Sequence, residues 1–285
     1  MNIFNSDLVL EIGSGHNPHP RTDILCDKHF APHDDRWDRD LKTDARPIII
    51  ADGEKLPFPD NAVDYTICSH VLEHTNDPAA FLLELQRVSK RGYIETPAPI
   101  ADSLLEWHAH NWFCFVRSNA LIIQKRDTDN FKGFFWDLLH KSPEFDLFYD
   151  IYSKSIFTTR YEWEESVNFK IIDDVHDFFS SQELVAGIES MSREKRLFRS
   201  NLKYIGLYIY KLFLSKNVRY KIYSQVNNIK SIPHHFRRIN KKKINVYDLL
   251  VCPFCKSRLT SEDNSLICDG CNKKYQVKNN IPILL

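Results

Sequence analysis

The chain lacks an excess of charge of either sign. Its 285 residues include 38 lysines and arginines against 38 aspartates and glutamates, and the formal net charge at pH 7 is +0. A balanced charge argues against a strongly basic nucleic-acid binder, although local basic patches survive such an average. One such patch lies at residues 234–243. We interpret it as a solvated linker, with a strip that contacts phosphates as the alternative.

The chain also lacks a long apolar run and a targeting segment. No apolar run reaches the roughly 20 residues that a helix needs to cross a bilayer, and no secretory signal or transit peptide opens the chain. We therefore expect a cytoplasmic protein without a transmembrane segment. The apolar stretch at residues 205–214 is expected to pack in a core, with a membrane surface or the C-terminal module as alternative partners.

A glycine-rich turn follows an apolar run near the start of the chain, at residues 8–15 (LVLEIGSG). Such a junction is typical of a loop that holds a nucleotide cofactor. Gly13 and Gly15 allow a positive φ and let the backbone approach a ligand closely, which a side chain would block. Many tight turns carry two glycines for backbone reasons only, so the pair alone does not decide between these interpretations.

Three further predicted strands end in chemically useful residues. These are Asp27, the pair Asp52 and Gly53, and His70. Because the carboxyl ends of successive strands meet at one edge of an open α/β sheet, we expect these residues to surround one site. Asp27 is the candidate to accept hydrogen bonds from ribose hydroxyls, and Asp52 from an exocyclic adenine amine. A single acid is more simply a loop cap or turn former, but three strand ends in register favour a binding site.

This ordered set resembles the class I S-adenosylmethionine-dependent methyltransferases, in particular the type 11 group. Residues 11–15 (EIGSG) are similar to the family's first motif, with Asn17 where a third glycine often stands, and residues 70–74 (HVLEH) are similar to a later motif. The resemblance covers roughly residues 7–100. It implies S-adenosylmethionine as cofactor and an α/β fold with a Rossmann-like, doubly wound sheet. The cofactor-binding residues that it implies are Glu11, Gly13, Ser14, Gly15, Asp27, Asp52, Gly53 and His70.

A nicotinamide-binding Rossmann domain is the competing interpretation, because it uses a similar glycine turn and acid. Its fingerprint, G-x-G-x-x-G, requires glycine at position 18, where this chain has Pro18. Pro18 and Pro20 also make a helix that starts directly after the loop less regular than the fingerprint expects. The methyltransferase interpretation therefore fits the sequence better.

Two Cys-x-x-Cys pairs lie near the other end of the chain, and twelve residues separate them. The four residues are Cys252, Cys255, Cys268 and Cys271. This spacing is typical of a zinc ribbon, in which two knuckles bring four thiolates around a tetrahedral ion. Disulfides are the alternative, but the chain shows no signal peptide and its other cysteines lie in apolar runs. Four protein ligands leave no open position, so we predict a structural Zn²⁺.

The residues around these cysteines resemble a known small module, the zinc-ribbon partner that stabilises and activates several RNA and protein methyltransferases. The resemblance covers roughly residues 246–285 and includes the closing residues 281–285 (IPILL). It implies a docking or stabilising role, either on the chain's own domain or toward a protein partner. We expect a methyltransferase domain over 1–175, a helical extension with a basic linker over 176–245, and a zinc ribbon over 246–285.

Hydrophobic patterning between the two motifs predicts several elements. The expected elements are an amphipathic helix over 77–90, strands over 111–116 and 120–124 joined by a turn, a helix over 131–139, a closing strand pair over 160–163 and 167–172, and a helical stretch over 195–229. The hairpin is expected to extend the sheet or to cover its edge.

Histidines on the expected cofactor edge are the candidates for a general base, because methyl transfer to a hydroxyl group requires the removal of a proton. We single out His70, His108 and His110 as candidate catalytic residues, the last two within an aromatic cluster at residues 106–112. The alternative is that these side chains cap, pack or face water. By resemblance to some sugar methyltransferases, His108 and His110 with a carboxylate are also a candidate site for a divalent ion.

Missing motifs disfavour two classes of methyl acceptor. The chain has neither the Asn-Pro-Pro-Tyr tetrapeptide of amino-methylating DNA and protein enzymes nor a cysteine pair suited to pyrimidine C5 chemistry. We therefore expect an oxygen or nitrogen acceptor on a small molecule or glycan, with RNA as the alternative. An inactive cofactor-binding scaffold that recruits a partner through its ribbon is the alternative of another class.

Overall fold

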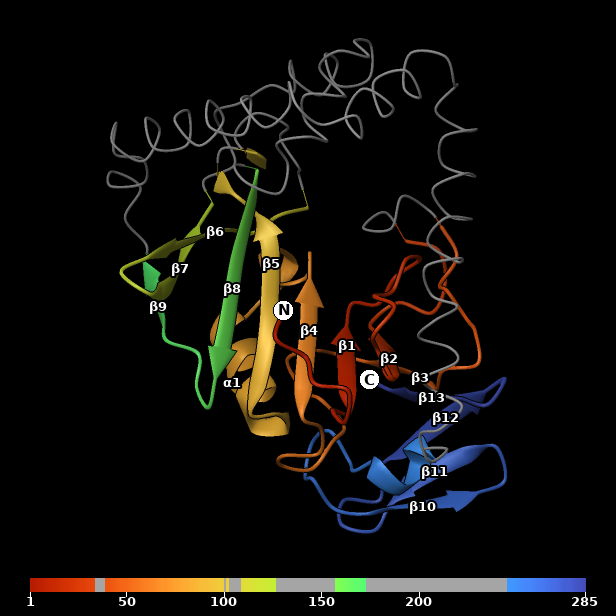
Figure 1. Cartoon of the computed structure of the whole chain (residues 1–285). Coiled ribbons are helices and arrows are strands. Elements are labelled where there is room, and N and C mark those ends of the chain that lie inside the picture. Colours follow the sequence, from red (N-terminus) through yellow and green to blue (C-terminus); the bar gives the residue numbers. More distant parts are fainter. Residues whose placement is uncertain (34–38, 100, 103–108, 127–156, 173–244) are drawn as a thin grey trace, which may run out of the picture.

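A computed structural model describes residues 1–33, 39–99, 101–102, 109–126, 157–172 and 245–285 of the chain (Figure 1). Four expectations fall outside these residues: the helices over 131–139 and 195–229, the basic run 234–243, and His108. Within the described part, no helix has the length and apolar character needed to pass through a lipid bilayer.

The described residues form a ten-stranded sheet in the order β10-β11-β12-β13-β3-β2-β1-β4-β5-β8 and a three-stranded sheet in the order β6-β7-β9 (Figure 1). The strands are β1 (Val9–Ile12), β2 (Ile24–Asp27), β3 (Ile48–Ala51), β4 (Tyr65–Ser69), β5 (Arg91–Pro97), β6 (Trp112–Arg117), β7 (Ala120–Lys125), β8 (Thr158–Glu164), β9 (Phe169–Ile172), β10 (Leu259–Glu262), β11 (Ser265–Cys268), β12 (Lys274–Lys278) and β13 (Ile281–Leu284). The central strands β3-β2-β1-β4-β5 are parallel. This order is that of a Rossmann-like sheet, which confirms the predicted fold class.

The central strands are mostly apolar, because they are covered on both faces. Every residue of β1, β2 and β3 is buried. The register pairs Ile12 with Cys26 and Asp27 with Ile50, so that the residues following β1 and β3 flank the end of β2. The predicted strand ends therefore meet at one edge of the sheet.

Helix α1 (Pro78–Val88) lies between β4 and β5 and confirms the predicted amphipathic helix. Asp77 caps it by accepting a hydrogen bond from the Ala80 nitrogen at 3.0 Å, and proline at the first helical position needs no hydrogen-bond partner for its nitrogen. The expected apolar stripe is buried in the core: Phe81, Leu82, Leu85 and Val88.

The connection from β1 to β2 is a loop over residues 13–23, and α1 is the one α-helix that lies wholly within the described residues. Pro18 and Pro20 explain the loop, because each removes a backbone donor and disfavours a helical conformation in the residue before it. The glycine turn therefore leads into a loop that side chains must hold in place.

Residues 112–125 form the predicted hairpin of β6 and β7. Its turn residues Ser118 and Asn119 have φ of 50° and 61°, as a two-residue hairpin turn requires. The predicted closing strand pair is wrong in its pairing: β8 pairs antiparallel with β5, whereas β9 pairs parallel with β7. Alternating patterns identify strands but do not identify partners, so the hairpin and β9 form a sheet of their own.

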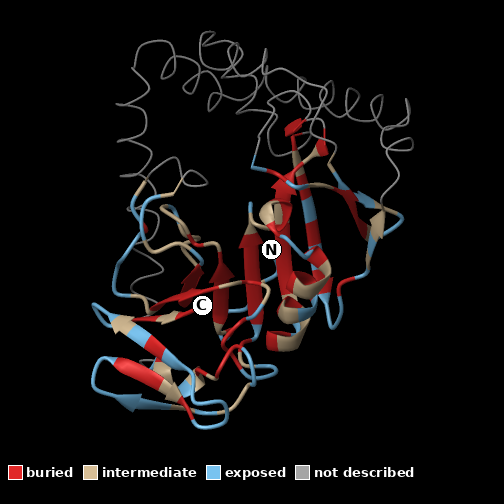
Figure 2. Cartoon of the chain, turned by 180° about the vertical axis from the view of Figure 1, so that it is seen from behind, coloured by how far each residue is buried: buried red, intermediate tan, exposed pale blue. Residues whose placement is uncertain are grey.

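The ribbon is continuous with the central sheet. It begins with the short helix η3 (Val246–Leu249), and its last strand runs parallel to β3, pairing Ile283 with Ile50 and Leu284 with Ala51. Ribbon residues such as Tyr275 share one hydrophobic core with the sheet. Figure 2 shows central strands that are buried along most of their length, whereas the ribbon strands differ: β10 is mostly exposed, β12 is partly exposed, and β11 and β13 are mostly buried. The three-part division at residues 175 and 245 stays a prediction.

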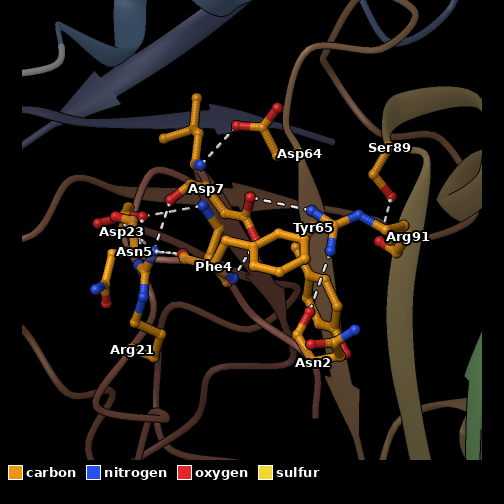
Figure 3. Close-up of polar contacts among 12 residues, drawn as sticks. Asn2, Phe4, Asn5, Asp7, Arg21, Asp23, Asp64, Tyr65, Ser89 and Arg91 are labelled. Atoms are coloured by element: carbon orange, nitrogen blue, oxygen red, sulfur yellow. Dashed lines mark hydrogen bonds and ion pairs between the residues drawn. The ribbon is translucent and has the colours of Figure 1, made fainter.

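Arg21 and Arg91 bind the N-terminal segment to the amino ends of the central strands (Figure 3). Arg91 donates to Asp7 Oδ1 at 3.0 Å and to the Asn2 carbonyl at 3.1 Å, and its guanidinium carbon lies 4.6 Å from the centre of the Phe4 ring. Arg21 donates to the carbonyls of Phe4 at 2.7 Å and Asp7 at 2.9 Å. These contacts lie at the end of the strands opposite the glycine loop, so they leave the predicted site clear.

Candidate functional site

The glycine loop turns sharply at the end of β1. The nitrogens of Gly13 and Ser14 both donate to the Cys26 carbonyl, at 2.9 and 3.0 Å, and Gly13 and Gly15 have φ of 72° and 53°. A Cβ on Gly13 would lie 2.1 Å from Val71 Cγ2. Glycine is therefore required at position 13 by the packing of the loop itself, in addition to any requirement from a ligand.

Glu11, the acid before the loop, is buried and holds the loop against the sheet. Its Oε2 accepts hydrogen bonds from Thr22 Oγ1 at 2.6 Å and from the His19 nitrogen at 2.9 Å. Burial raises the pKa of the Glu11 carboxyl to about 7, because these hydrogen bonds and the Arg46 charge offset the loss of solvent only in part. This carboxyl therefore changes its charge near neutral pH.

Asp27 at the end of β2 positions the same loop. Its Oδ2 accepts from the Gly15 nitrogen and its Oδ1 from the His29 nitrogen, both at 2.9 Å. An ionised carboxylate offers about four acceptor positions. Asp27 can therefore hold the loop and accept a ligand hydroxyl at the same time.

Asp52 links the ends of β2 and β3. Its Oδ2 lies 2.8 Å from Lys28 Nζ, and its Oδ1 accepts from the Glu54 nitrogen at 3.0 Å. A Cβ on Gly53 would lie 2.4 Å from Phe81 Cε2, so this glycine lets α1 approach the turn closely. The structure thus places Asp52 and Gly53 at the predicted edge and gives both a role in the turn.

Ser14 contributes a buried hydroxyl to the glycine loop. The residue is 3% exposed, and its Oγ has no hydrogen-bond partner among the described residues. A buried hydroxyl without a partner is costly and is usually satisfied by a ligand or an ordered water. With the acids Glu11 and Asp27 nearby, the loop fits a ligand that carries both hydroxyls and a cationic group, as S-adenosylmethionine does.

His70 follows β4 at the same edge, in the left-handed conformation with φ of 57°. Its side chain is 52% exposed, with Nδ1 at 3.3 Å from Glu73 Oε1 and Nε2 at 3.9 Å from Glu95 Oε1. Burial alone would lower the pKa of this imidazole, but the carboxylates of Glu73 and Glu95 outweigh burial and raise it.

Behind His70 lies a group that we call the acid–histidine cluster: Glu73, His74, Asp102 and His110. Glu73 and His74 belong to the short helix η2 (Leu72–His74). One ligand atom from each of Glu73, His74 and His110 lies within 4.8 Å of the other two. His110 Nδ1 lies 2.6 Å from Asp102 Oδ1, and the rings of His74 and His110 meet edge to face with centroids 4.6 Å apart. Burial alone would raise the pKa of Glu73, but the three surrounding histidines lower it.

The structure brings two of the three predicted catalytic histidines, His70 and His110, around one carboxylate, that of Glu73. Neither Glu73 nor Asp102 was predicted from the sequence. Glu73 stands three residues after His70 in the HVLEH motif, and this spacing of a histidine and an acid was a usable signal, although His70 itself is not helical. Asp102 carries no motif, and only the fold shows that it contacts His110.

The four predicted zinc ligands converge in the ribbon. Cys252 Sγ lies 3.7 Å from Cys271 Sγ, and Cys255 Sγ lies 3.3 Å from Cys268 Sγ, with all four sulfurs within 4.8 Å of one another. Zinc–sulfur bonds of about 2.3 Å in a tetrahedron separate the sulfurs by about 3.8 Å, so this group is a candidate zinc site. The Tyr275 hydroxyl lies 3.1 Å from Cys252 Sγ, where it can donate to the thiolate and hold this ligand in place.

A Rossmann-like sheet with a glycine loop and acids at its carboxyl edge, joined to a four-cysteine ribbon, is the architecture of a cofactor-binding α/β domain with a metal-binding module. Residues 30–94 match the family model described as methyltransferase domain, and residues 243–280 match the one described as Trm112p-like protein. The chain therefore combines a methyltransferase domain with a C-terminal Trm112p-like domain.

Similar proteins include an uncharacterized methyltransferase of Schizosaccharomyces pombe, which is 55% identical over 38 residues, or 13% of this chain and 14% of that protein. Among solved structures, a complex between the Haloferax volcanii Trm112 methyltransferase activator and a putative methyltransferase is 21% identical with a TM-score of 0.27, over 34% of this chain and 47% of that one. A SAM-dependent methyltransferase from Aquifex aeolicus is 20% identical with a TM-score of 0.24, over 32% and 57%. The chain thus spans a small part of its curated relative and about half of these structures.

Proposed function

We propose that this protein transfers a methyl group from S-adenosylmethionine to an oxygen or nitrogen atom of a small molecule or glycan. One observation carries the proposal. The glycine loop, Asp27 and Asp52 lie together at one edge of the parallel sheet, within a methyltransferase-type domain. A nucleoside ligand needs hydroxyl acceptors and an acceptor for its base amine, and these two acids supply both.

S-adenosylmethionine, when bound, supplies a methyl group on a positively charged sulfur. Transfer is an in-line displacement, so the main task of the protein is to position donor and acceptor. Asp27 would hold the ribose, Asp52 the adenine amine, and Glu11 with Ser14 the polar groups near the loop. His70, which is half-exposed at the same edge, is the candidate for contact with the acceptor.

The ribbon is proposed to act as a built-in activator, with Zn²⁺ held by its four cysteines. β13 extends the parallel sheet at β3, the strand that carries Asp52 at its end. Lys256 of the first knuckle donates to the Leu56 carbonyl at 3.0 Å and to Glu84 Oε2 at 3.1 Å. These contacts hold the segment that follows Asp52, so a folded ribbon supports the cofactor edge.

Calorimetric titration of the zinc-replete protein with S-adenosylmethionine tests the proposal. We expect micromolar binding by the native protein. Asp52→Ala should weaken it at least about tenfold, because each hydrogen bond to a charged group contributes roughly 1.5–3 kcal/mol. Asp27→Asn should weaken it similarly, since it removes the ionised acceptor while keeping an oxygen for the loop. Asp60→Ala is the control, because its carboxylate is 73% exposed and pairs with Arg87.

Loss of binding in the control, or equal affinity in all variants, would contradict the assignment of the site. Failure of the native protein to bind would contradict the proposed cofactor, whereas binding without methyl transfer to any acceptor would favour the inactive cofactor-binding scaffold. Once binding is established, methyl incorporation is measured with pooled glycans and small hydroxylated acceptors beside total RNA. Incorporation into RNA alone would overturn the proposed acceptor class.

Cofactor affinity is expected to depend on pH through Glu11. Its carboxyl has a pKa of about 7, raised by burial, so it is largely neutral at lower pH and ionised at higher pH. A cationic ligand binds more tightly beside the ionised form. We therefore expect the affinity for S-adenosylmethionine to rise several-fold between about pH 6 and about pH 8. The measurement is calorimetry across this range, with a flat profile expected for Glu11→Gln and a weaker slope for the demethylated product, which lacks the sulfonium charge.

A further inference from the structure

We propose that Glu73, His74 and His110 form a second metal site, for a divalent first-row transition-metal ion. The site is distinct from the four-cysteine ribbon. One ligand atom from each of the three side chains lies within 4.8 Å of the others, with Glu73 and His110 buried and His74 partly buried. Two imidazoles and one carboxylate are a donor set that such ions take, with coordination positions left open for water or substrate.

Hydrogen bonds at Nδ1 of both imidazoles leave Nε2 as the candidate metal-binding atom of each ring. His74 Nδ1 lies 3.0 Å from the Ala109 carbonyl, which can only accept, so Nδ1 carries the proton and Nε2 keeps its lone pair. His110 Nδ1 lies 2.6 Å from the Asp102 carboxylate, which orients this ring in the same sense. A metal-bound histidine commonly donates its other ring N–H to a carbonyl or a carboxylate, and this cluster has one of each.

The carboxylate of Glu73 is the second, independent sign of a ligand. The residue is 1% exposed, and neither of its oxygens has a hydrogen-bond partner of good geometry among the described residues. His70 Nδ1 lies 3.3 Å from its Oε1. Burying a carboxylate without hydrogen bonds of good geometry is costly unless it is paired with a cation or coordinates a metal. A cation between Glu73 and the two imidazoles would satisfy it.

The cluster is also held rigidly, as a metal site must be. The Asn111 nitrogen donates to the Glu73 carbonyl at 2.7 Å, and Asn111 Nδ2 donates to the His74 carbonyl at 3.2 Å. Trp112 Nε1 donates to the Thr75 carbonyl at 2.7 Å. The chain before β6 is therefore fixed against η2, which keeps His110 beside Glu73 and His74.

The place of the cluster suggests what the ion would do, and this step rests on the proposed methyl transfer. Glu73 contacts His70, the half-exposed histidine at the cofactor edge. An ion with open positions there would bind an acceptor oxygen and favour its deprotonated form. The acceptor class that fits is a hydroxyl compound able to chelate, such as a sugar or another vicinal diol.

The test uses protein loaded with one equivalent of Zn²⁺ per chain, enough for the four-cysteine site alone. It is titrated with Co²⁺ alone and followed by calorimetry and visible absorption. Zn²⁺ binds divalent sites more tightly than Co²⁺ and four cysteine sulfurs favour it, so the ribbon keeps its ion. We expect one equivalent of Co²⁺ per chain. Asp102→Asn should weaken binding about 10–100-fold, as loss of the carboxylate that holds a ligand histidine does, and Glu73→Gln and His74→Ala should weaken it further.

His29→Ala is the matched control, because His29 and His33 form a stacked pair elsewhere, with ring centroids 3.7 Å apart, that could collect Co²⁺ adventitiously. It should leave uptake unchanged. Melting curves identify any variant that fails to fold. If Glu73→Gln does not fold, His74→Ala, at a partly exposed position, is the ligand variant used instead. No uptake by the native protein, equal uptake by the cluster variants, or loss of uptake in His29→Ala would each overturn the proposal. Because no cofactor is added, failure of the methyltransferase proposal leaves this result unaffected.

Discussion

Removal of zinc is expected to lower the unfolding temperature of the central sheet as well as that of the ribbon. Structural zinc contributes about 10–16 kcal/mol to the folding of small zinc domains, which is comparable to the whole stability of an ordinary domain. Without it the ribbon unfolds and β13 leaves β3. The shared core then loses Leu250, Leu266 and Tyr275, each of which contributes about 1.5–3 kcal/mol when buried.

Scanning calorimetry of zinc-replete and chelated protein measures this effect, with Cys268→Ser as the genetic equivalent of chelation. We expect one cooperative transition in the zinc-replete protein and a strongly lowered one after chelation. Affinity for S-adenosylmethionine should fall as well, because Asp52 directly follows β3. Cys114→Ser is the control, since Cys114 is a buried thiol of the same core outside the four-sulfur group, and its variant should keep its dependence on zinc. An upper transition that is unchanged by chelation would show that the sheet is stable without the ribbon.

Gly13→Ala is expected to destabilise the protein by about 3 kcal/mol and to abolish detectable cofactor binding. A φ of 72° costs a residue with a side chain about 1–2 kcal/mol, and a Cβ only 2.1 Å from Val71 Cγ2 adds the roughly 1–3 kcal/mol of an overpacked site. Relief of the clash would move the glycine loop away from Cys26 and Asp27. Urea denaturation measures the first effect and calorimetric titration the second.

The double variant Gly13→Ala with Val71→Ala separates these two causes. Val71→Ala removes the clashing methyl group but leaves the backbone conformation unchanged, so the double variant should recover the overpacking part of the loss and retain the part due to φ. Val71→Ala alone is the reference for the double-mutant cycle. A coupling energy near zero would mean that Val71 does not restrict position 13.

Sequence patterns predicted the central sheet well because its strands are short apolar runs bounded by glycine, proline and acids, and such runs are specified locally. The same holds for α1, whose cap at Asp77 and apolar stripe stand within one segment. The predicted order of strand ends followed from a general rule of parallel sheets, and the register of β1, β2 and β3 has this order.

Pairing between strands distant in the chain could not be predicted from the sequence. The strands β8 and β9 were located, but they were predicted to pair with each other, and nothing in their alternating patterns specified β5 and β7 as partners. The contact between Asp102 and His110 likewise depends on how two loops meet. The sequence predicted that the ribbon is a module stabilised by a bound metal. The structure adds that the ribbon shares a hydrophobic core with the central sheet.

The parallel pairing of β13 with β3 also has a consequence for the order of folding. Ile50 pairs with Ile283, so nearly the whole chain must be synthesised before β3 acquires its outer neighbour. Pairing between segments so distant in sequence is slow, since a very long loop must close first. Until then the run Ile48-Ile49-Ile50 presents an open, apolar strand edge of the kind that joins other chains. If Zn²⁺ binding folds the ribbon, as we propose, it would also bring β13 to this edge and protect it from misassembly.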